Sequence, residues 1–138
     1  MIDAFVQQFT SEPVLSHSIS KEFYSIPPHV LEVMKSIPLE PLSAGIFLGE
    51  TVKKRFIPSL PLLQMIGPKT EKIAVIDEKA EWLFLCGRDV FPASILKSRF
   101  DDTEVIVVNK KNEVLGLGIK SSDGVKNKHH LGEYLHEE

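Results

Sequence analysis

The stretch EWLFLCGRDVFP, Glu81–Pro92, decides how the second half of this chain is interpreted. Its apolar run ends at Gly87, and a cation and an anion follow. The stretch is compatible with a phosphate loop, a redox cysteine in an active site, or a strand that turns into a helix. Because a continuous apolar run is typical of burial on both faces, it predicts a buried strand over Trp82–Cys86. Gly87 is then the turn, and Asp89 caps a short helix over Val90–Leu96.

The segments around this stretch are rich in β-forming residues. The expected elements are a strand at Lys72–Ile76, a turn at Asp77–Ala80, a strand at Val105–Val108, a turn at Asn109–Asn112, a paired strand at Val114–Ile119, and a closing strand or helical turn at His130–His136. The residues from 69 onward therefore predict a compact, β-rich domain.

The first half has a more helical texture. The expected elements are a helix at Met1–Phe9, one or two strands within Val14–Ile26, a helix from Pro27-Pro28 to Ile37, strands at Ala44–Val52 and Phe56-Ile57, and a helix capped by Ser59 that runs to Ile66. Gly67-Pro68 is the strongest local break. We therefore expect two domains, residues 1–68 and 69–138.

Composition excludes several classes of protein. The chain has 138 residues, a net charge of −3 and a pI near 6.0, which argues against non-specific coating of nucleic acid. No apolar run approaches the ~20 residues that span a bilayer, and the first residues do not resemble a secretory signal. One cysteine cannot form an internal disulfide, so we expect a reducing, cytoplasmic environment and no membrane association.

Two motifs suggest chemistry but fit structural roles better. Gly116-x-Gly118 lacks the third glycine of a dinucleotide loop and lies within a predicted strand, where glycines mark bulges or close backbone crossings. Cys86 has no histidine near it in sequence, and cysteine is among the most buried residue types. We therefore predict a packed thiol in the domain core rather than a nucleophile.

The histidines and acids do not form a recognisable site. His129-His130 and His136 could suggest a metal, but adjacent residues of a strand point to opposite faces and the spacing of metal ligands is missing. None of the 19 acidic residues forms an evident catalytic pair. The sequence therefore supports neither an enzyme nor a metal or other cofactor.

Three basic clusters are the remaining candidates for a binding site: Lys53-Lys54-Arg55, Lys97 with Arg99, and the segment from Lys120 to His130. The last contains one acid, Asp123, and is either a solvated loop or an anion-binding patch. If RNA is bound, we expect its contacts to be chiefly Lys120, Lys126, Lys128, His129 and His130, with Arg88, Lys97 and Arg99 as second-rank contacts. Lys126 and Lys128 share one side if their segment is extended.

The order of motifs in the second half resembles a known family. FLCGRDVFPASI, a VIVV strand, NKKNEVLGLGIK and a closing LGEYL are similar to the PUA domain, a small RNA-binding β-barrel. That resemblance implies that Gly87 is a strand-to-helix turn and that the apolar run before it forms barrel wall.

The resemblance extends into the first half. With FYSIPPHVLEVMKSIP and SAGIFLGETVKKRFIPSLPLLQMIGP, residues 14–138 look like the Nip-seven family of large-subunit ribosome-biogenesis factors. The short segment before the first strand favours an archaeal homologue. The family implies an α+β fold, in which a small α+β N-terminal domain contacts ribosome-assembly proteins and a PUA-type barrel contacts pre-ribosomal RNA. It implies no catalysis and no DNA partner.

Two other functions stay open. The chain is either an RNA-binding assembly factor, a protein–protein adaptor whose PUA-like barrel does not bind RNA, or an accessory subunit of an RNA-modifying enzyme. Convergence of Lys120, Lys126 and Lys128 on one face favours RNA, whereas scattered lysines favour the adaptor.

Overall fold

The computed structural model of the protein describes residues 2–12, 14, 16–19, 22–26 and 46–130. The predicted helix from Pro27-Pro28 to Ile37, and the closing segment beyond His130, lie outside these residues. The chain divides into two compact units between Leu62 and Leu63, slightly before the break expected at Gly67-Pro68.

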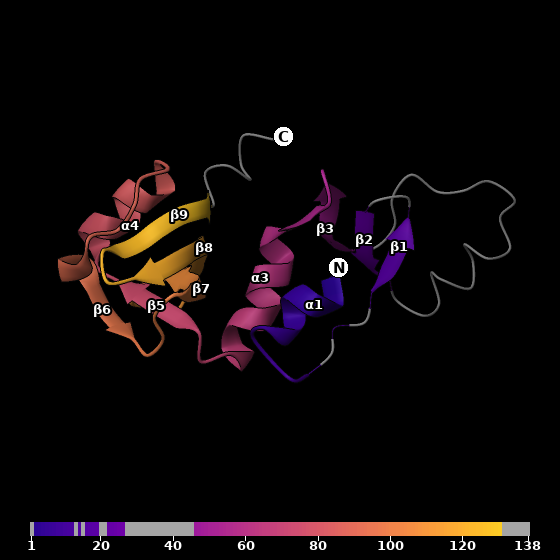
Figure 1. The fold of residues 1–138 in the computed structure, drawn as a ribbon, viewed down its shortest axis with the longest axis horizontal. Coiled ribbons are helices and arrows are strands. Elements are labelled where there is room, and N and C mark those ends of the chain that lie inside the picture. The colour runs from indigo at the N-terminus through magenta and orange to yellow at the C-terminus, as the bar shows by residue number, and fades with distance from the viewer. Residues whose placement is uncertain (1, 13, 15, 20–21, 27–45, 131–138) are drawn as a thin grey trace, which may run out of the picture. The chain divides into compact units, whose positions relative to one another are not determined.

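The N-terminal unit combines one helix with an antiparallel sheet (Figure 1). Its elements are α1 (Ile2–Gln7), β1 (His17–Ile19), β2 (Glu22–Ser25), β3 (Ile46–Val52) and β4 (Arg55–Pro58), with the strands in the order β1-β2-β3-β4. Helix α3 (Leu60–Ile66) follows, and a 3-10 turn η1 (Gly67–Lys69) ends it. The helices and strands predicted for these residues are confirmed.

Aromatic side chains form much of the N-terminal core. The ring of Phe5 lies 5.2 Å from that of Phe9 and 5.4 Å from that of Phe56, and Phe23 meets Phe56 edge-on at 5.7 Å. Such tilted and edge-on pairs contribute about 0.5–1.5 kcal/mol beyond their buried area. These contacts therefore fix Phe56, the second residue of β4, against α1 and β2.

The turn between β3 and β4 has an unusual backbone. Val52 pairs with Arg55, so Lys53 and Lys54 form a two-residue turn, with φ angles of 50° and 65°. Positive φ at both positions is the geometry of a type I′ hairpin, which favours Asn-Gly. A left-handed conformation costs a non-glycine residue ~1–2 kcal/mol. This turn is therefore strained.

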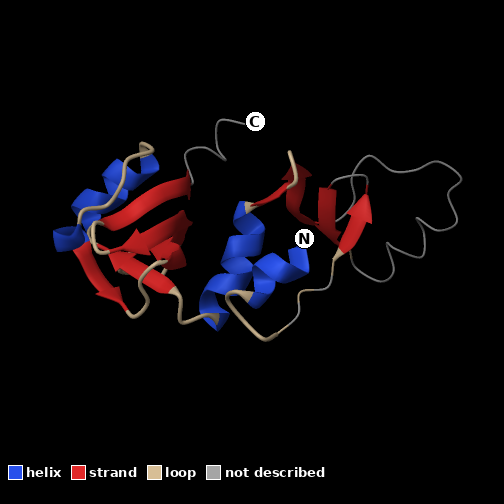
Figure 2. Cartoon of the chain, viewed as in Figure 1, coloured by secondary structure: helices blue, strands red, loops and turns tan. Residues whose placement is uncertain are grey.

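The C-terminal unit is built on a five-stranded sheet, shown in red in Figure 2. Its strands are β5 (Ile73–Ile76), β6 (Ile95–Ser98), β7 (Thr103–Val108), β8 (Val114–Ser121) and β9 (Gly124–His130), in the order β6-β5-β7-β8-β9. The β5–β7 pair is parallel and the other pairs are antiparallel. The predicted strands β5, β7 and β8 are confirmed.

The sheet is closed by the segment that contains β6. At one end of this segment, Val90 exchanges backbone hydrogen bonds with Val125 of β9; at the other end, β6 pairs with β5. The enclosed core consists of Ala74, Ile76, Ala80, Phe84, Val90, Val105, Val107, Leu115 and Val125. Because both sheet edges are joined in this way, the unit is a small barrel with an apolar interior.

The predicted buried strand at Trp82–Cys86 is wrong. Residues Glu78–Leu85 form helix α4, and the predicted turn at Asp77–Ala80 is its start: the Asp77 Oδ1 accepts a hydrogen bond of 2.8 Å from the N–H of Ala80. Ala80 and Phe84, four residues apart, are buried, whereas Trp82 is 70% exposed. A short apolar run does not distinguish a buried strand from a helix, and here the acids before it favour the helix.

The predictions for Gly87 and the residues after it are also corrected. Gly87 has φ +91°, and its N–H bonds to Phe84 O while that of Arg88 bonds to Leu83 O. This is a Schellman motif, so Gly87 ends a helix instead of starting one. The helix expected over Val90–Leu96 is instead a bridge at Val90, a 3-10 turn η2 (Pro92–Ser94) and β6. Cys86, expected in the core, is exposed.

Two predictions for the β7–β8–β9 region can be compared with the structure: the turn at Asn109–Asn112 and the role of Gly116. The Asn109 side-chain oxygen accepts the N–H groups of Lys111 and Glu113, which fixes the predicted turn. Gly116 has φ +158°, and a Cβ there would lie 2.1 Å from His129 O. The expected close backbone crossing is therefore confirmed. The sequence alone allowed either a loop or a strand for the segment that forms β9.

Candidate nucleic-acid interface

Strand β9 places three predicted contact residues on the outside of the barrel. Lys126 pairs with Ile119 and His129 with Leu117, on the face opposite the core residue Val125. Lys128 is the extra residue of a bulge between them. A bulge interrupts the two-residue alternation of a strand, so Lys128 and His129 share the side that Lys126 occupies.

The charges on this face are partly compensated. Lys128 Nζ lies 2.5 Å from Glu104 Oε1 of β7, whereas Lys126 is exposed and has no ion pair with a described residue. Asp89 is close by, but its Oδ1 accepts the N–H of Asn127 at 2.8 Å. Lys126 therefore carries the most accessible positive charge of β9.

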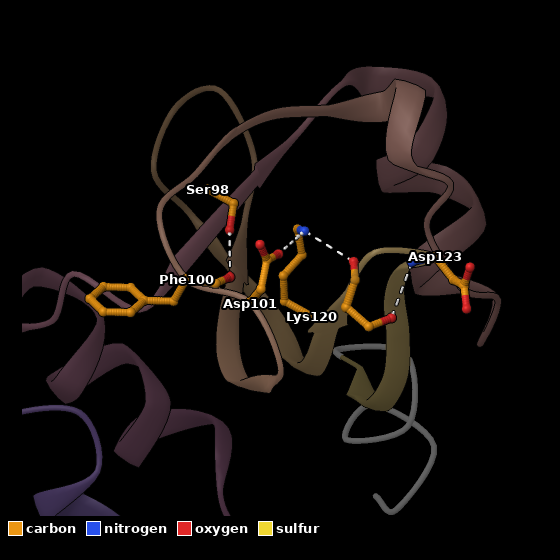
Figure 3. A network of polar contacts seen from close by, with 6 residues as sticks. Ser98, Phe100, Asp101, Lys120 and Asp123 are labelled. Atoms are coloured by element: carbon orange, nitrogen blue, oxygen red, sulfur yellow. Dashed lines mark hydrogen bonds and ion pairs between the residues drawn. The ribbon is translucent and has the colours of Figure 1, made fainter.

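Lys120 does not join this face. It pairs with Thr103 and Val125, so it occupies an inward position at the end of β8. Its Nζ lies 2.6 Å from Asp101 Oδ1 and donates to Ser121 O at 3.0 Å, as Figure 3 shows. With its side chain 14% exposed, Lys120 is engaged within the protein.

His130 and Arg88 lie at the junction of β9 with the end of α4. His130 pairs with Gly116, on the inward side of β9, and its Nε2 would be 3.4 Å from a Cβ at Gly87. The Asn127 amide donates to Phe84 O at 2.9 Å and to Arg88 O at 3.2 Å. These contacts bring the helix end beside β9, and Arg88 is exposed.

Lys97 and Arg99 belong to the β5–β6 side of the barrel. Lys97 lies on β6 and pairs with Val75 of β5, and Arg99 follows that strand. They border a hollow of about 240 Å³ with Ile73 and Val75 in its lining. Arg99 also pairs with Glu71, at 3.5 Å. These two cations therefore form a site of their own.

Sequence reasoning missed two exposed aromatic residues of the C-terminal unit. Trp82 on α4 is 70% exposed, and Phe91, after the bridge at Val90, is 72% exposed. The available signal was the four-residue spacing of Ala80 and Phe84, which puts both on one face of an α-helix. If that face packs against the core of the domain, Trp82 lies on the opposite, solvent-facing side. Exposed aromatic rings are surfaces on which unpaired bases stack.

The described residues contain no group of three or more His, Cys, Asp or Glu side chains placed to hold a metal ion. Among these residues there is also no helix with the length and apolar character needed to cross a membrane.

The pKa of Tyr24 is raised to about 12, first by burial and second by the hydrogen bond to Glu22. That group belongs to the N-terminal sheet rather than to the β9 surface.

Comparison with known proteins identifies the family. The sequence pattern of the UPF0113 PUA domain matches residues 72–138. A UPF0113 protein of Aeropyrum pernix is 32% identical over 122 residues, covering 83% of this chain and 68% of the relative. The chain belongs to the UPF0113 family. A UPF0113 protein of Archaeoglobus fulgidus is 33% identical over 111 residues; the match covers 78% of this chain and 62% of that relative, less than two thirds of its length.

Two solved structures share the fold of this UPF0113 chain. A conserved PUA domain protein from Thermoplasma acidophilum superposes with a TM-score of 0.60 over 97% of this chain and 89% of its own, at 16% identity. A hypothetical protein from Pyrococcus horikoshii has a TM-score of 0.52 over 66% of each chain, at 22% identity. The predicted α+β class with a PUA-type barrel is therefore confirmed, as is the resemblance to archaeal PUA proteins.

Proposed function

We propose that this UPF0113 chain is a non-catalytic, cytoplasmic RNA-binding protein that assists assembly of the large ribosomal subunit. Its PUA domain contacts pre-ribosomal RNA, and its N-terminal unit contacts assembly proteins. The observation that carries the proposal is the outer face of β9, where Lys126, Lys128 and His129 project together, on the strand that Asn127 joins to the end of α4.

This face suits the sugar-phosphate backbone of a single strand. Lysines bind phosphates as point charges, and such contacts position an RNA without reading its sequence. Lys126 and Lys128 are exposed and two residues apart on one strand, so they can contact neighbouring phosphates. Ile119, 37% exposed between β7 and β9, gives the same face an apolar patch.

Aromatic and planar side chains near the helix end can hold bases. Trp82 lies one helical turn before Cys86, the last residue before the Gly87 turn, and Asn127 joins that turn to β9. Single-stranded RNA is bound largely by stacking of splayed bases on aromatic or guanidinium planes. Trp82 and Arg88 supply such planes, while β9 supplies the cations.

Titration of a labelled single-stranded RNA against salt tests the proposal. Each phosphate neutralised contributes about −0.7 to the slope of log affinity against log salt, so two to three cations of β9 and its surroundings contribute about −1.4 to −2.1 to that slope. Lys126→Ala/Lys128→Ala should weaken binding and reduce this slope by about 1.4. The matched control is Lys110→Ala/Lys111→Ala, which removes the same charge from exposed positions at the other end of β8.

One observation favours the adaptor as a second candidate. Lys120 and Lys128 each pair with a carboxylate, Asp101 and Glu104, so two of the three lysines expected to converge are already compensated. If the Lys126→Ala/Lys128→Ala variant binds RNA like the parent, with the same salt slope, β9 is not the RNA surface. Failure of the parent itself to bind RNA would leave the adaptor as the better description.

A further inference from the structure

We propose that the tip of the β3–β4 hairpin, Lys53-Lys54-Arg55, is a second phosphate-binding site, which grips the backbone of the RNA held by the C-terminal unit. This inference rests on the proposed RNA-binding function and extends it to the N-terminal unit. The site would recognise phosphate charge, without regard to base sequence.

The backbone of the tip is the first reason. Lys53 and Lys54 have φ angles of 50° and 65° in a two-residue turn closed by the Val52–Arg55 pair. Asparagine and glycine adopt this conformation readily, whereas lysine does not. Lys53 and Lys54 therefore destabilise the turn that they form. Backbone strain of this kind is found often at functional sites.

The charge of the tip is the second reason. Lys53, Lys54 and Arg55 are all exposed, and they make no ion pair with a described residue. They are three of the five lysines and arginines in the first 62 residues of the chain. Three adjacent, like charges repel one another, so an anion that neutralises them gains binding energy without first breaking a salt bridge.

The hairpin stem holds these cations in a defined place. Phe56 follows Arg55 directly, and its ring packs against Phe5 at 5.4 Å and Phe23 at 5.7 Å. Gly49 of β3 leaves room for the same ring, because a Cβ there would lie 2.6 Å from Phe56 Cζ. A tip presented by a rigid stem loses less conformational entropy on binding.

The composition of the tip favours nucleic acid over a protein partner. Protein interfaces centre on aromatic and apolar anchors, with charged residues depleted from their core. The tip offers three cations, and Val52, 38% exposed, is the apolar neighbour before them. Lysine and arginine groups of this kind are the usual contacts of phosphate oxygens. Joined to a second site on one chain, even a weak contact of this sort raises the overall affinity.

The test is the full-length variant Lys53→Asn/Lys54→Gly, titrated with single-stranded RNA over a range of salt. This pair is the sequence that a type I′ turn favours, so the unfolding midpoint should rise while RNA affinity falls. The salt slope should decrease by about 1.4, since two cations are lost. Lys110→Ala/Lys111→Ala again removes two charges from a hairpin turn and should leave the slope unchanged.

The outcomes separate this inference from the proposed function. If the parent binds RNA and Lys126→Ala/Lys128→Ala weakens it, but Lys53→Asn/Lys54→Gly binds with the parent's affinity and slope, the tip is not a phosphate site and the function stands. If the parent does not bind RNA, both fail. A tip variant that keeps its RNA affinity but loses an acidic protein partner also overturns the phosphate assignment.

Discussion

The side-chain amide of Asn127 donates to the backbone carbonyl of Phe84 at 2.9 Å, and this bond ties β9 to the end of α4. The same amide donates to Arg88 O at 3.2 Å. Phe84 O also accepts the N–H of Gly87 at 2.9 Å, so Asn127 supplies the second donor to a carbonyl of the last helical turn. The arrangement of the candidate interface depends on this side chain, although its own charge is zero.

Asn127→Ala should therefore destabilise the C-terminal unit and weaken RNA binding without changing its salt dependence. Two hydrogen bonds with net contributions of about 0.5–1.5 kcal/mol each are lost, so we expect a loss of about 1–3 kcal/mol in the free energy of unfolding. Urea denaturation measures the loss, and Lys126→Ala, a change at the exposed neighbour, is the control. Unchanged stability would show that water replaces the amide.

Gly87→Ala and Gly116→Ala should differ in severity. At Gly87 a Cβ meets His130 Nε2 at an ordinary 3.4 Å, so the cost is the left-handed backbone, about 1 kcal/mol. At Gly116 a Cβ would lie 2.1 Å from His129 O, so β8 and β9 cannot keep their pairing. Thermal unfolding should show a modest shift for Gly87→Ala and loss of the cooperative transition for Gly116→Ala. Equal shifts would contradict the close crossing at Gly116.

Cys86 should react as a surface thiol. Its side chain is exposed at the end of α4, so a thiol reagent should label the native protein at one site without prior unfolding. Cys86→Ala should change the free energy of unfolding by no more than about 0.5 kcal/mol, as is usual for surface substitutions. Protection of the thiol until the protein unfolds would restore the buried position that the sequence predicted.

Much of the fold follows from local pattern. Ser59 caps α3 through a bond from the N–H of Leu62 to its hydroxyl oxygen, and the turn at Asn109 forms where the sequence predicts it, because each uses contacts within four residues. The run WLFLC was misread although local contacts set its helix, because a short apolar run alone does not distinguish a helix from a strand. The segment after it was misread for another reason. Pairing of Val90 with Val125 takes the following segment away from helix, and single-sequence periodicity does not report such a contact.

The candidate site was predictable in part. An extended segment was enough to place Lys126 and Lys128 on one side, and β9 has that arrangement; the bulge adds His129 to the same side. The ion pair of Lys120 with Asp101 was not foreseeable, since it joins residues 19 positions apart across a loop. Trp82 was missed because the wrong secondary structure put its ring inside the barrel. Which of these residues contact RNA stays a prediction.

Tyr24 should make stability depend on pH in the alkaline range. Burial, with the hydrogen bond to Glu22, raises its pKa from 10.0 to about 12, so the folded state favours the neutral phenol. The stabilisation is complete below pH 10 and is lost as the pH rises from 10 to 12. The unfolding midpoint should fall over this range, and Tyr24→Phe should show a smaller fall. Parallel curves for the two proteins would exclude Tyr24 as the cause.

Trp82 should report RNA binding directly. It is the single tryptophan of the chain and is 70% exposed, so a base stacked on its ring should quench the intrinsic fluorescence. Trp82→Ala should weaken binding by about 1–3 kcal/mol, the range for one stacked base, while the salt slope stays the same because no charge is removed. Stability should hardly change, since the ring packs little against the core. Trp82→Phe keeps an aromatic face and should retain part of the affinity. RNA binding at full affinity without quenching would place the bases away from α4, and the contact would then be confined to the cations of β9.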